Sequence, residues 1–288
     1  TQDGRWQYTW NGENRLIKAE TRDDLPESVP HVTVTYAYDH RGRMVWKQIT
    51  APDTPTKPIT YTWDDYNIIA EVDSRESGVT TTYNLWGLDL SGTIQSAGGV
   101  GGLLAVVKNN ESFTATYDGN GNVAEYVSSN GTITAHYEYS PFGEIVVQSG
   151  DLANSFTHRF STKPWCMITR LSEYEFRKYS PNLGRWIHRD PIGEVGGLNL
   201  YGFTKNNVAN RVDPLGQQCW NDGPRKMVDS FSLPLGHMSH IRYSYKGSEL
   251  VSVGTPGIIL LPPGGIVVEK KYCLCKCESE KATYSFSI

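Results

Sequence analysis

Two copies of an Asp-Pro-x-Gly motif follow one another in the second half of the chain, Asp190-Pro-Ile-Gly193 and Asp213-Pro-Leu-Gly216. Each motif by itself predicts a tight turn, because Asp caps its own backbone, Pro fixes φ and Gly accepts a positive φ. If the fold brings the two carboxylates together, they cannot both ionise cheaply, so one keeps a proton while the other activates a water. Such a pair is able to hydrolyse a peptide bond with no metal and no cofactor.

The scaffold for such a pair is predicted by a phrase that recurs upstream, roughly once in 20 to 30 residues. In most copies two aromatic residues stand two apart, and Asp or Asn, often with Gly, follows. The copies are Tyr8-Thr-Trp10-Asn11-Gly12, Tyr36-Ala-Tyr38-Asp39, Tyr61-Thr-Trp63-Asp64, Tyr117-Asp118-Gly119-Asn120-Gly121 and Tyr137-Glu-Tyr139-Ser-Pro141-Phe142-Gly143. Aromatics two apart lie on one face of a strand, and the polar residue and Gly reverse the chain. Each phrase therefore predicts one β-hairpin, and hairpins with one apolar face must stack into a continuous sheet.

Composition agrees with such a sheet. Hydrophobic residues make up 38% of the 288 residues, yet there are 17 Tyr and 8 Trp, so much of the apolar area is aromatic and amphipathic. The formal net charge is −4, with Lys and Arg scattered, which argues against nucleic acid as a partner of the main body. No signal peptide or membrane span is expected, and a chain that opens on Thr1 instead of Met indicates a fragment.

Two other segments contain residues that suggest chemistry. Gly98–Gly102 interrupts the repeats and predicts a flexible turn, and it is no phosphate loop because no Lys-Ser or Lys-Thr follows it. In the C-terminal segment, His237 and His240 are candidates for a general base pair or are ordinary loop histidines.

Four of the five cysteines lie near the C-terminus, at Cys219, Cys273, Cys275 and Cys277. On a strand the last three thiols would share a face, and Cys219 would supply a fourth zinc ligand, although the Cys-x-Cys spacing is shorter than in the usual zinc sites. A zinc site, a disulfide and free thiols all remain open, and no other metal and no cofactor is predicted.

The second half of the chain resembles the Rhs repeat-associated core, and the upstream phrases resemble the YD repeats of the same family. The resemblance rests on motifs in a fixed order, two of them the Asp-Pro-x-Gly turns. The motifs are Tyr179-Ser-Pro181-Asn-Leu-Gly184-Arg185-Trp186, Arg189-Asp190-Pro191-Ile-Gly193, Gly196-Gly-Leu-Asn199-Leu-Tyr201, Asn206-Asn207 and Asp213-Pro214-Leu-Gly216. The match covers nearly all of residues 1–216 and none of the tail.

The resemblance implies a mainly β fold of stacked antiparallel hairpins, a segment of a YD-repeat β-shell that ends in an Rhs core plug and a small β-rich tail. The implied domains are a YD-repeat sheet at 1–159, the Rhs core at 160–217 and a variable tail or effector at 218–288. In that family, which includes polymorphic toxins and the C components of insecticidal toxin complexes, the shell encloses a C-terminal effector. The expected partners are therefore the tail, further YD repeats upstream, a secretion-system component and a cognate immunity protein, and the expected location is secreted or at a bacterial cell surface.

The family core acts as an intramolecular aspartyl protease, which by resemblance gives Asp190 and Asp213 catalytic roles in a single self-cleavage. Arg189 is expected to lower the pKa of one carboxyl if its guanidinium lies close by. The expected cut is at Gln217-Gln218, although the family usually has Leu where this chain has Gln217. Asn199, Asn206 and Asn207 are expected to fix the loop between the aspartates, and Tyr201 to pack into the plug.

Two other functions are compatible with the same residues. In the first, the core is a catalytically inert cap of a cell-surface YD-repeat interaction protein, and the Asp-Pro-x-Gly motifs are only turns. In the second, the Trp and Tyr side chains bind carbohydrate, but the repeated spacing already assigns those rings to the sheet. A tail separated by self-cleavage would distinguish the protease from both.

Overall fold

The computed structural model describes residues 2–52, 58–74, 78–209 and 211–217, and the strands at 240–245, 248–253 and 283–287. The chain divides into two compact units, Thr1–Gln218 and Cys219–Ile288. The described residues form strands and short 3-10 helices, so the prediction of a mainly β protein is confirmed. Within these residues there is no helix with the length and apolar character needed to cross a membrane.

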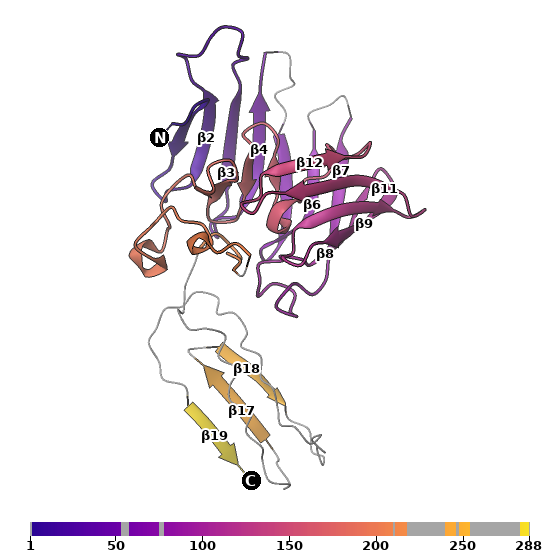
Figure 1. Ribbon diagram of the computed structural model, residues 1–288, viewed down its shortest axis with the longest axis vertical. Helices are drawn as coiled ribbons and strands as arrows, with labels where there is room; N and C mark the ends of the chain where they lie inside the picture. The colour runs from indigo at the N-terminus through magenta and orange to yellow at the C-terminus, as the bar shows by residue number, and fades with distance from the viewer. Residues whose placement is uncertain are drawn as a thin grey trace. The chain divides into compact units, whose positions relative to one another are not determined.

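Twelve strands of the first unit form one antiparallel sheet, in which each strand pairs with its neighbours in sequence (Figure 1). This order is that of hairpins stacked side by side, as the repeats predicted. The strands are β1 (Trp6–Trp10), β2 (Leu16–Thr21), β3 (Thr33–Tyr38), β4 (Met44–Thr50), β5 (Pro58–Asp64), β6 (Asn67–Asp73), β7 (Thr80–Trp86), β8 (Leu103–Lys108), β9 (Glu111–Tyr117), β10 (Val123–Ser128), β11 (Ile133–Tyr139) and β12 (Ile145–Ser149).

A shared turn explains the Asp or Asn of the repeated phrase. Between β3 and β4, the Asp39 N–H donates to the carbonyl of Arg43 at 2.9 Å, and the Gly42 N–H donates to the carbonyl of Asp39 at 3.0 Å. Oδ1 of Asp39 also accepts hydrogen bonds from the N–H groups of Arg41 and Arg43. Gly42 has a φ of 86°, a left-handed conformation that costs glycine little. The same backbone turn begins at Asn11, Asp118 and Ser140.

From β3 onward, an aromatic side chain at the end of the first strand of each hairpin joins that hairpin to the preceding one. The Tyr38 hydroxyl donates to the carbonyl of Leu16 at 2.8 Å, and the Tyr139 hydroxyl donates to the carbonyl of Val123 at 2.8 Å. Equivalent bonds run from Trp63 Nε1 to the Met44 carbonyl, from Trp86 Nε1 to the Ile68 carbonyl and from the Tyr117 hydroxyl to the Leu103 carbonyl. These interhairpin bonds connect every consecutive pair of the hairpins β1–β2 to β11–β12, so the sheet has side-chain links in addition to its backbone ladder.

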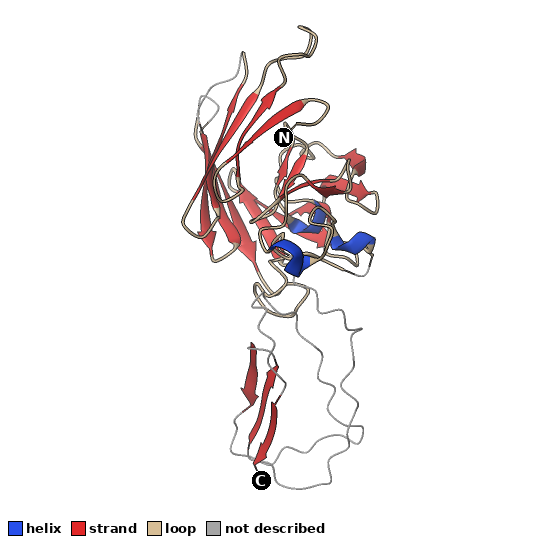
Figure 2. Ribbon diagram, turned by 90° about the vertical axis from the view of Figure 1, so that its left-hand side faces the viewer, coloured by secondary structure: helices blue, strands red, loops and turns tan. Residues whose placement is uncertain are grey.

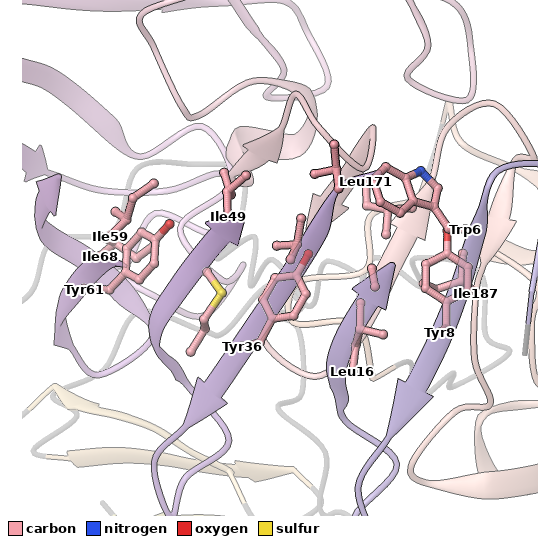
Figure 3. Close-up of a cluster of buried hydrophobic side chains, with 14 residues drawn as sticks. Trp6, Tyr8, Leu16, Tyr36, Ile49, Ile59, Tyr61, Ile68, Leu171 and Ile187 are labelled. Carbon is pink, nitrogen blue, oxygen red and sulfur yellow. The ribbon is translucent and has the colours of Figure 1, made fainter. Parts of the chain in front are cut away.

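The segment after β12 packs against one face of the sheet, and we call residues 150–217 the plug; its short helices are drawn in blue in Figure 2. Leu171 and Ile187 of the plug pack into the same buried cluster as Tyr8, Tyr36 and Tyr61 of the sheet (Figure 3). The plug contains a four-stranded antiparallel sheet and three short 3-10 helices. They are β13 (Trp165–Cys166), β14 (Leu171–Glu173), β15 (Lys178–Ser180), β16 (Arg185–Trp186), η1 (Phe160–Thr162), η2 (Gly193–Gly196) and η3 (Thr204–Asn206).

Buried charges also hold the plug on the sheet. Lys47 of β4 donates from Nζ to Oε2 of Glu173 in β14 at 2.8 Å, and both side chains are almost fully buried. Glu71 of β6 accepts a hydrogen bond from the Thr157 hydroxyl of the plug at 3.1 Å. Since a buried charge without a partner is costly, these contacts favour one position of the plug on the sheet over others.

The glycine-rich segment between β7 and β8 differs from its prediction. Ala97 and Val100 in it are fully buried. Oδ2 of Asp89 accepts hydrogen bonds from the N–H groups of Ala97 at 2.7 Å and Gly99 at 3.2 Å. The prediction of a flexible turn is therefore wrong, because a buried carboxylate organises the loop from within.

The second unit contains three described strands, β17 (His240–Tyr245), β18 (Ser248–Val253) and β19 (Thr283–Ser287). They form an antiparallel sheet with β17 in the centre. The described strands agree with the expected β-rich tail, and the domain boundaries at 159/160 and 217/218 stay predictions.

Candidate functional site

Asp190 and Asp213 lie together in the plug, and both contact the same arginine nitrogen. Nη2 of Arg177 is 2.9 Å from Oδ2 of Asp190 and 3.0 Å from Oδ2 of Asp213. All three side chains are buried or nearly so. The two Asp-Pro-x-Gly motifs, far apart in sequence, thus supply two carboxylates to a single cation.

The other oxygen of each aspartate builds the local turn. Oδ1 of Asp213 accepts hydrogen bonds from the N–H of Gly216 at 2.8 Å and of Gln217 at 3.0 Å. Oδ1 of Asp190 accepts from the N–H of Ile192 at 3.1 Å, and the N–H of Gly193 donates to the Asp190 carbonyl. Each motif therefore forms the predicted turn and still directs Oδ2 into the pair.

The structural elements fix this geometry from two sides. Arg177 directly precedes β15, and its guanidinium carbon lies 4.1 Å from the ring centroid of Trp186 in β16. The Asp190 N–H donates to the carbonyl of Leu200 at 3.0 Å, and Nη1 of Arg177 donates to the same carbonyl at 3.4 Å. The stacked guanidinium has little freedom to turn away from the carboxylates.

Burial dominates the electrostatics of the pair. Removal from water raises the pKa of Asp213 to about 6, the Arg177 charge opposes this shift, and the nearby Asp190 charge adds to it. Burial also lowers the pKa of Arg177 from its usual value, against the two carboxylates, which raise it. Asp213 consequently holds a proton more readily than an ordinary aspartate.

The backbone at the predicted cleavage position lies within this site. Nε of Arg177 donates to the carbonyl of Gly216, and the Gln217 N–H is bonded to Asp213. Gln217 is the last described residue of the plug, and Gln218 lies outside the described residues. Asp213 and Arg177 are thus within hydrogen-bond reach of the peptide that precedes the expected cut.

The cation beside both carboxyls is Arg177, which the sequence reasoning did not select. Arg189, which was selected, has an exposed side chain, and its carbonyl accepts a hydrogen bond from Nδ2 of Asn14 at 3.2 Å. The structure therefore corrects the expectation that Arg189 tunes the pair. No local sequence signal marks Arg177, since Arg159 of the same segment is equally buried and has another role.

The loop between the aspartates follows its prediction in part. Oδ1 of Asn199 accepts a hydrogen bond from the Tyr201 N–H at 3.1 Å, and the Asn206 N–H donates to the carbonyl of Phe203. Tyr201 itself is 38% exposed, so the prediction that it packs into the plug is wrong. Phe203, 2% exposed, packs there against Tyr179 and Trp186.

The other candidates for chemistry fall elsewhere. The side chains of His237, His240 and the four C-terminal cysteines lie outside the described residues. Cys166 is a buried free thiol in β13. Within the described part of the chain, no group of three or more His, Cys, Asp or Glu side chains is arranged to hold a metal ion.

Comparison with known families finds one that covers most of the chain. The family described as the teneurin YD-shell matches residues 2–209. This range spans the long sheet and most of the plug, including Arg177 and Asp190, and it ends before Asp213.

Curated relatives match over a similar length. The chain is 26% identical over 226 residues to the tRNA3(Ser)-specific nuclease WapA of Bacillus spizizenii, and 28% identical over 224 residues to the double-stranded DNA deaminase toxin A of Burkholderia cenocepacia. The alignments cover 76% and 73% of this chain, but only 9% and 15% of the relatives. The chain therefore spans a small part of the proteins it matches.

Solved structures share the fold. The crystal structure of TcdB2-TccC3-TEV superposes with a TM-score of 0.60 at 22% sequence identity. The match covers 74% of this chain and 10% of that chain. At this identity the comparison establishes the architecture of sheet and plug, and no more.

Proposed function

Since the chain belongs to the teneurin YD-shell family, as its repeats predicted, we propose that it is the shell-and-plug segment of a toxin-like protein and cuts its own backbone after Gln217. One observation carries the proposal. Asp190 and Asp213 share one nitrogen of Arg177 beside the backbone of Gln217. Two carboxylates with different environments are the minimum apparatus of an aspartyl protease.

In the proposed reaction the two aspartates take different roles. Asp213 is the acid, because its burial favours the protonated form and raises its pKa to about 6. Asp190, the base in this proposal, takes a proton from a water, whose oxygen bonds to the carbonyl carbon of Gln217. Asp213 gives its proton to the nitrogen of Gln218 as the C–N bond breaks, which leaves a carboxyl group on Gln217 and an amine on Gln218. The cut is intramolecular and happens once per chain.

The cut would release residues 218–288 as a separate piece. The names of two relatives, a tRNA-specific nuclease and a DNA deaminase toxin, support the idea that such a C-terminal piece is an effector enclosed or presented by the shell. The partners of the segment would then be its own tail, further YD repeats, a component of a secretion machinery and a cognate immunity protein. Secreted or cell-surface delivery follows from the same proposal.

The test is the intact mass of the full 288-residue chain, purified without protease exposure. We expect a loss of about 8 kDa, in proportion to the residues after Gln217, from the full mass of 32.2 kDa. Asp190→Asn and Asp213→Asn should each keep the full mass, because an amide keeps the Oδ1 acceptor of the turn but neither holds nor accepts the catalytic proton.

The matched control is Asp118→Asn in the turn between β9 and β10. Oδ1 of Asp118 accepts hydrogen bonds from the N–H groups of Asn120 and Asn122, so this aspartate has the same turn role without the pair. Asp118→Asn should be cut like the wild type. Equal masses for the wild type and both site variants, whether cut or uncut, would contradict the proposed protease.

The second candidate function is a catalytically inert cap of a cell-surface YD-repeat interaction protein. The observation in its favour is that Asp190 and Asp213 both bond to their own turns through Oδ1, which is a sufficient structural reason for their presence. This candidate predicts a single uncut mass for the wild type and no toxicity from residues 218–288.

A further inference from the structure

The glycine-rich loop between β7 and β8 reaches from the sheet to the turn that carries Asp213. Gly98 of this loop lies directly against Pro214: a methyl group at Gly98 would be 2.1 Å from the Pro214 carbonyl oxygen and 2.6 Å from its carbonyl carbon. Gly98 also has a φ of +63°. No other residue allows this approach of backbone to backbone, so the space in which Pro214 sits depends on glycine.

The plug holds the same loop from its other side. Nζ of Lys163 donates to the carbonyl of Gly98 at 2.8 Å and contacts both carboxylate oxygens of Glu175, at 2.9 and 3.0 Å. Lys163 and Glu175 are nearly fully buried. The next residue, Phe176, donates its N–H to the carbonyl of Leu215 at 3.1 Å. Pro214 is therefore held between Gly98 and the backbone that leads into Arg177.

Hydrogen bonds to the sheet and to the plug hold the loop in place. Besides the internal bonds to Asp89, the Gln95 side chain accepts a hydrogen bond from the Tyr66 N–H at 2.9 Å and donates to the Asp64 carbonyl at 2.7 Å. The Gly101 N–H donates to the Thr162 hydroxyl at 2.8 Å. The loop is thus tied at once to the β5–β6 hairpin and to η1 of the plug.

We propose that Gly98 is a positioning residue: the loop of the shell sets the place of Asp213 against Arg177 and Asp190, so that the site is complete only when sheet and plug are assembled. This inference rests on the proposed function for its effect on cleavage. The effect of Gly98 on the environment of Asp213 is measurable without cleavage.

The test compares two glycines of the same loop. Gly98→Ala places a methyl group against Pro214, whereas Gly92→Ala places one where nothing lies within 4 Å. Both glycines have positive φ, +63° and +72°, so both variants carry a similar backbone strain. A difference between them therefore reports the contact with Pro214.

The first readout is the titration of Asp213, followed by carboxyl NMR on the full chain. In Gly98→Ala the Asp213 titration should move away from that of the wild type, while in Gly92→Ala it should stay in place. To keep the titration on uncut chain, it is measured in the Asp190→Asn background for all three proteins. Coincident Asp213 titrations in the two glycine variants would overturn the inference.

The second readout is the rate of cleavage and its pH profile. Gly98→Ala should cut about 100-fold more slowly than Gly92→Ala, the effect of a displacement of about 1 Å at a catalytic group, with a shifted pH profile. If the wild type does not cut at all, the proposed function fails, and the titration alone then decides whether Gly98 positions Asp213.

A milder variant covers the case in which Gly98→Ala does not fold. Gln95→Ala removes both bonds between the loop and the β5–β6 hairpin and adds no group. It should shift the Asp213 titration and slow cleavage in the same direction, by a smaller factor. An unchanged titration in a folded Gln95→Ala chain would count against the inference as well.

Discussion

Aspartate caps turns in both the sheet and the plug, yet only in the plug do two such carboxylates meet at a candidate active site. Asp39 in the sheet and Asp213 in the plug both bond through Oδ1 to N–H groups of their own turns. Oδ2 of Asp39 then accepts from Nε of Arg43, four residues away, whereas Oδ2 of Asp213 contacts Arg177, distant in sequence and buried.

The difference in burial reverses the direction of the pKa shift. For Asp39, burial is the largest single contribution and raises the pKa, but the bonds from Arg43 and from backbone N–H groups together outweigh it, so its pKa lies below the usual value. For Asp213, burial outweighs the bonds it accepts, and its pKa rises to about 6. The turn motif supplies the aspartate, and the depth at which the turn lies decides its chemistry.

The largest contrast is expected when the cation of each turn is removed. Arg177→Met leaves two buried carboxylates facing each other, and we expect a loss of about 3 to 5 kcal/mol in the free energy of unfolding. Arg43→Met, at the partly exposed pair in the sheet, should lose less than about 1 kcal/mol. Urea unfolding at neutral pH measures both losses. Losses of equal size would mean that the plug turn depends on its cation no more than the sheet turn does.

The second contrast is in pH dependence. Because the folded state raises the pKa of Asp213, the folded chain binds this proton more tightly than the unfolded chain, and the stabilisation is lost as pH rises from about 4 to about 6. The wild type should lose up to about 3 kcal/mol relative to Asp213→Asn over that window. Asp39 has the opposite sign, so its stabilisation is lost as pH falls.

Unfolding free energies of the wild type, Asp213→Asn and Asp39→Asn at several pH values test these signs. To exclude a change of length between samples, the wild type is represented by the uncut Asp190→Asn chain, and both substitutions are made in that background. There the Asp213 pKa lacks the upward contribution of the Asp190 charge, so the loss with rising pH should be smaller than in the wild type and of the same sign. A parallel pH dependence in all three would show that neither turn titrates as described.

A smaller effect is expected in the sheet, where stability is distributed over many interhairpin bonds. Tyr139→Phe removes the hydroxyl that donates to the Val123 carbonyl and should cost about 1 kcal/mol. Tyr83→Phe, in which the ring is 54% exposed, is the control and should change stability by less than about 0.5 kcal/mol. If the two variants unfold at the same urea concentration, the interhairpin bonds contribute nothing beyond the backbone ladder.

The hairpins could be predicted from the sequence because their signals are local. Tyr36 and Tyr38 stand two apart and share a face, and Asp39 caps the turn that follows at once. The Asp-Pro-x-Gly turns were predictable for the same reason. A turn is specified by four or five consecutive residues, so it needs no knowledge of the rest of the fold.

The partner of the two aspartates could not be predicted in this way. Arg189 adjoins Asp190 in sequence, but Asp190 is buried while Arg189 is exposed, so the two neighbouring side chains lie in different surroundings. Arg177 reaches the pair only through the folding of the plug. The packing of Phe203 in place of Tyr201, and of Gly98 against Pro214, are likewise tertiary facts that no local pattern encodes.

The register of the interhairpin bonds has a consequence for how such an array can vary. In each bond the acceptor carbonyl belongs to the residue that pairs with the aromatic of its own hairpin, as Leu103 pairs with Trp86 across the long loop at residues 87–102. The geometry of the interhairpin bond therefore does not depend on the number of residues in the loop at the hairpin tip. Longer loops at the tips therefore leave the stacking of the hairpins unchanged. In this chain the long loop at residues 87–102 also contacts the turn that carries Asp213.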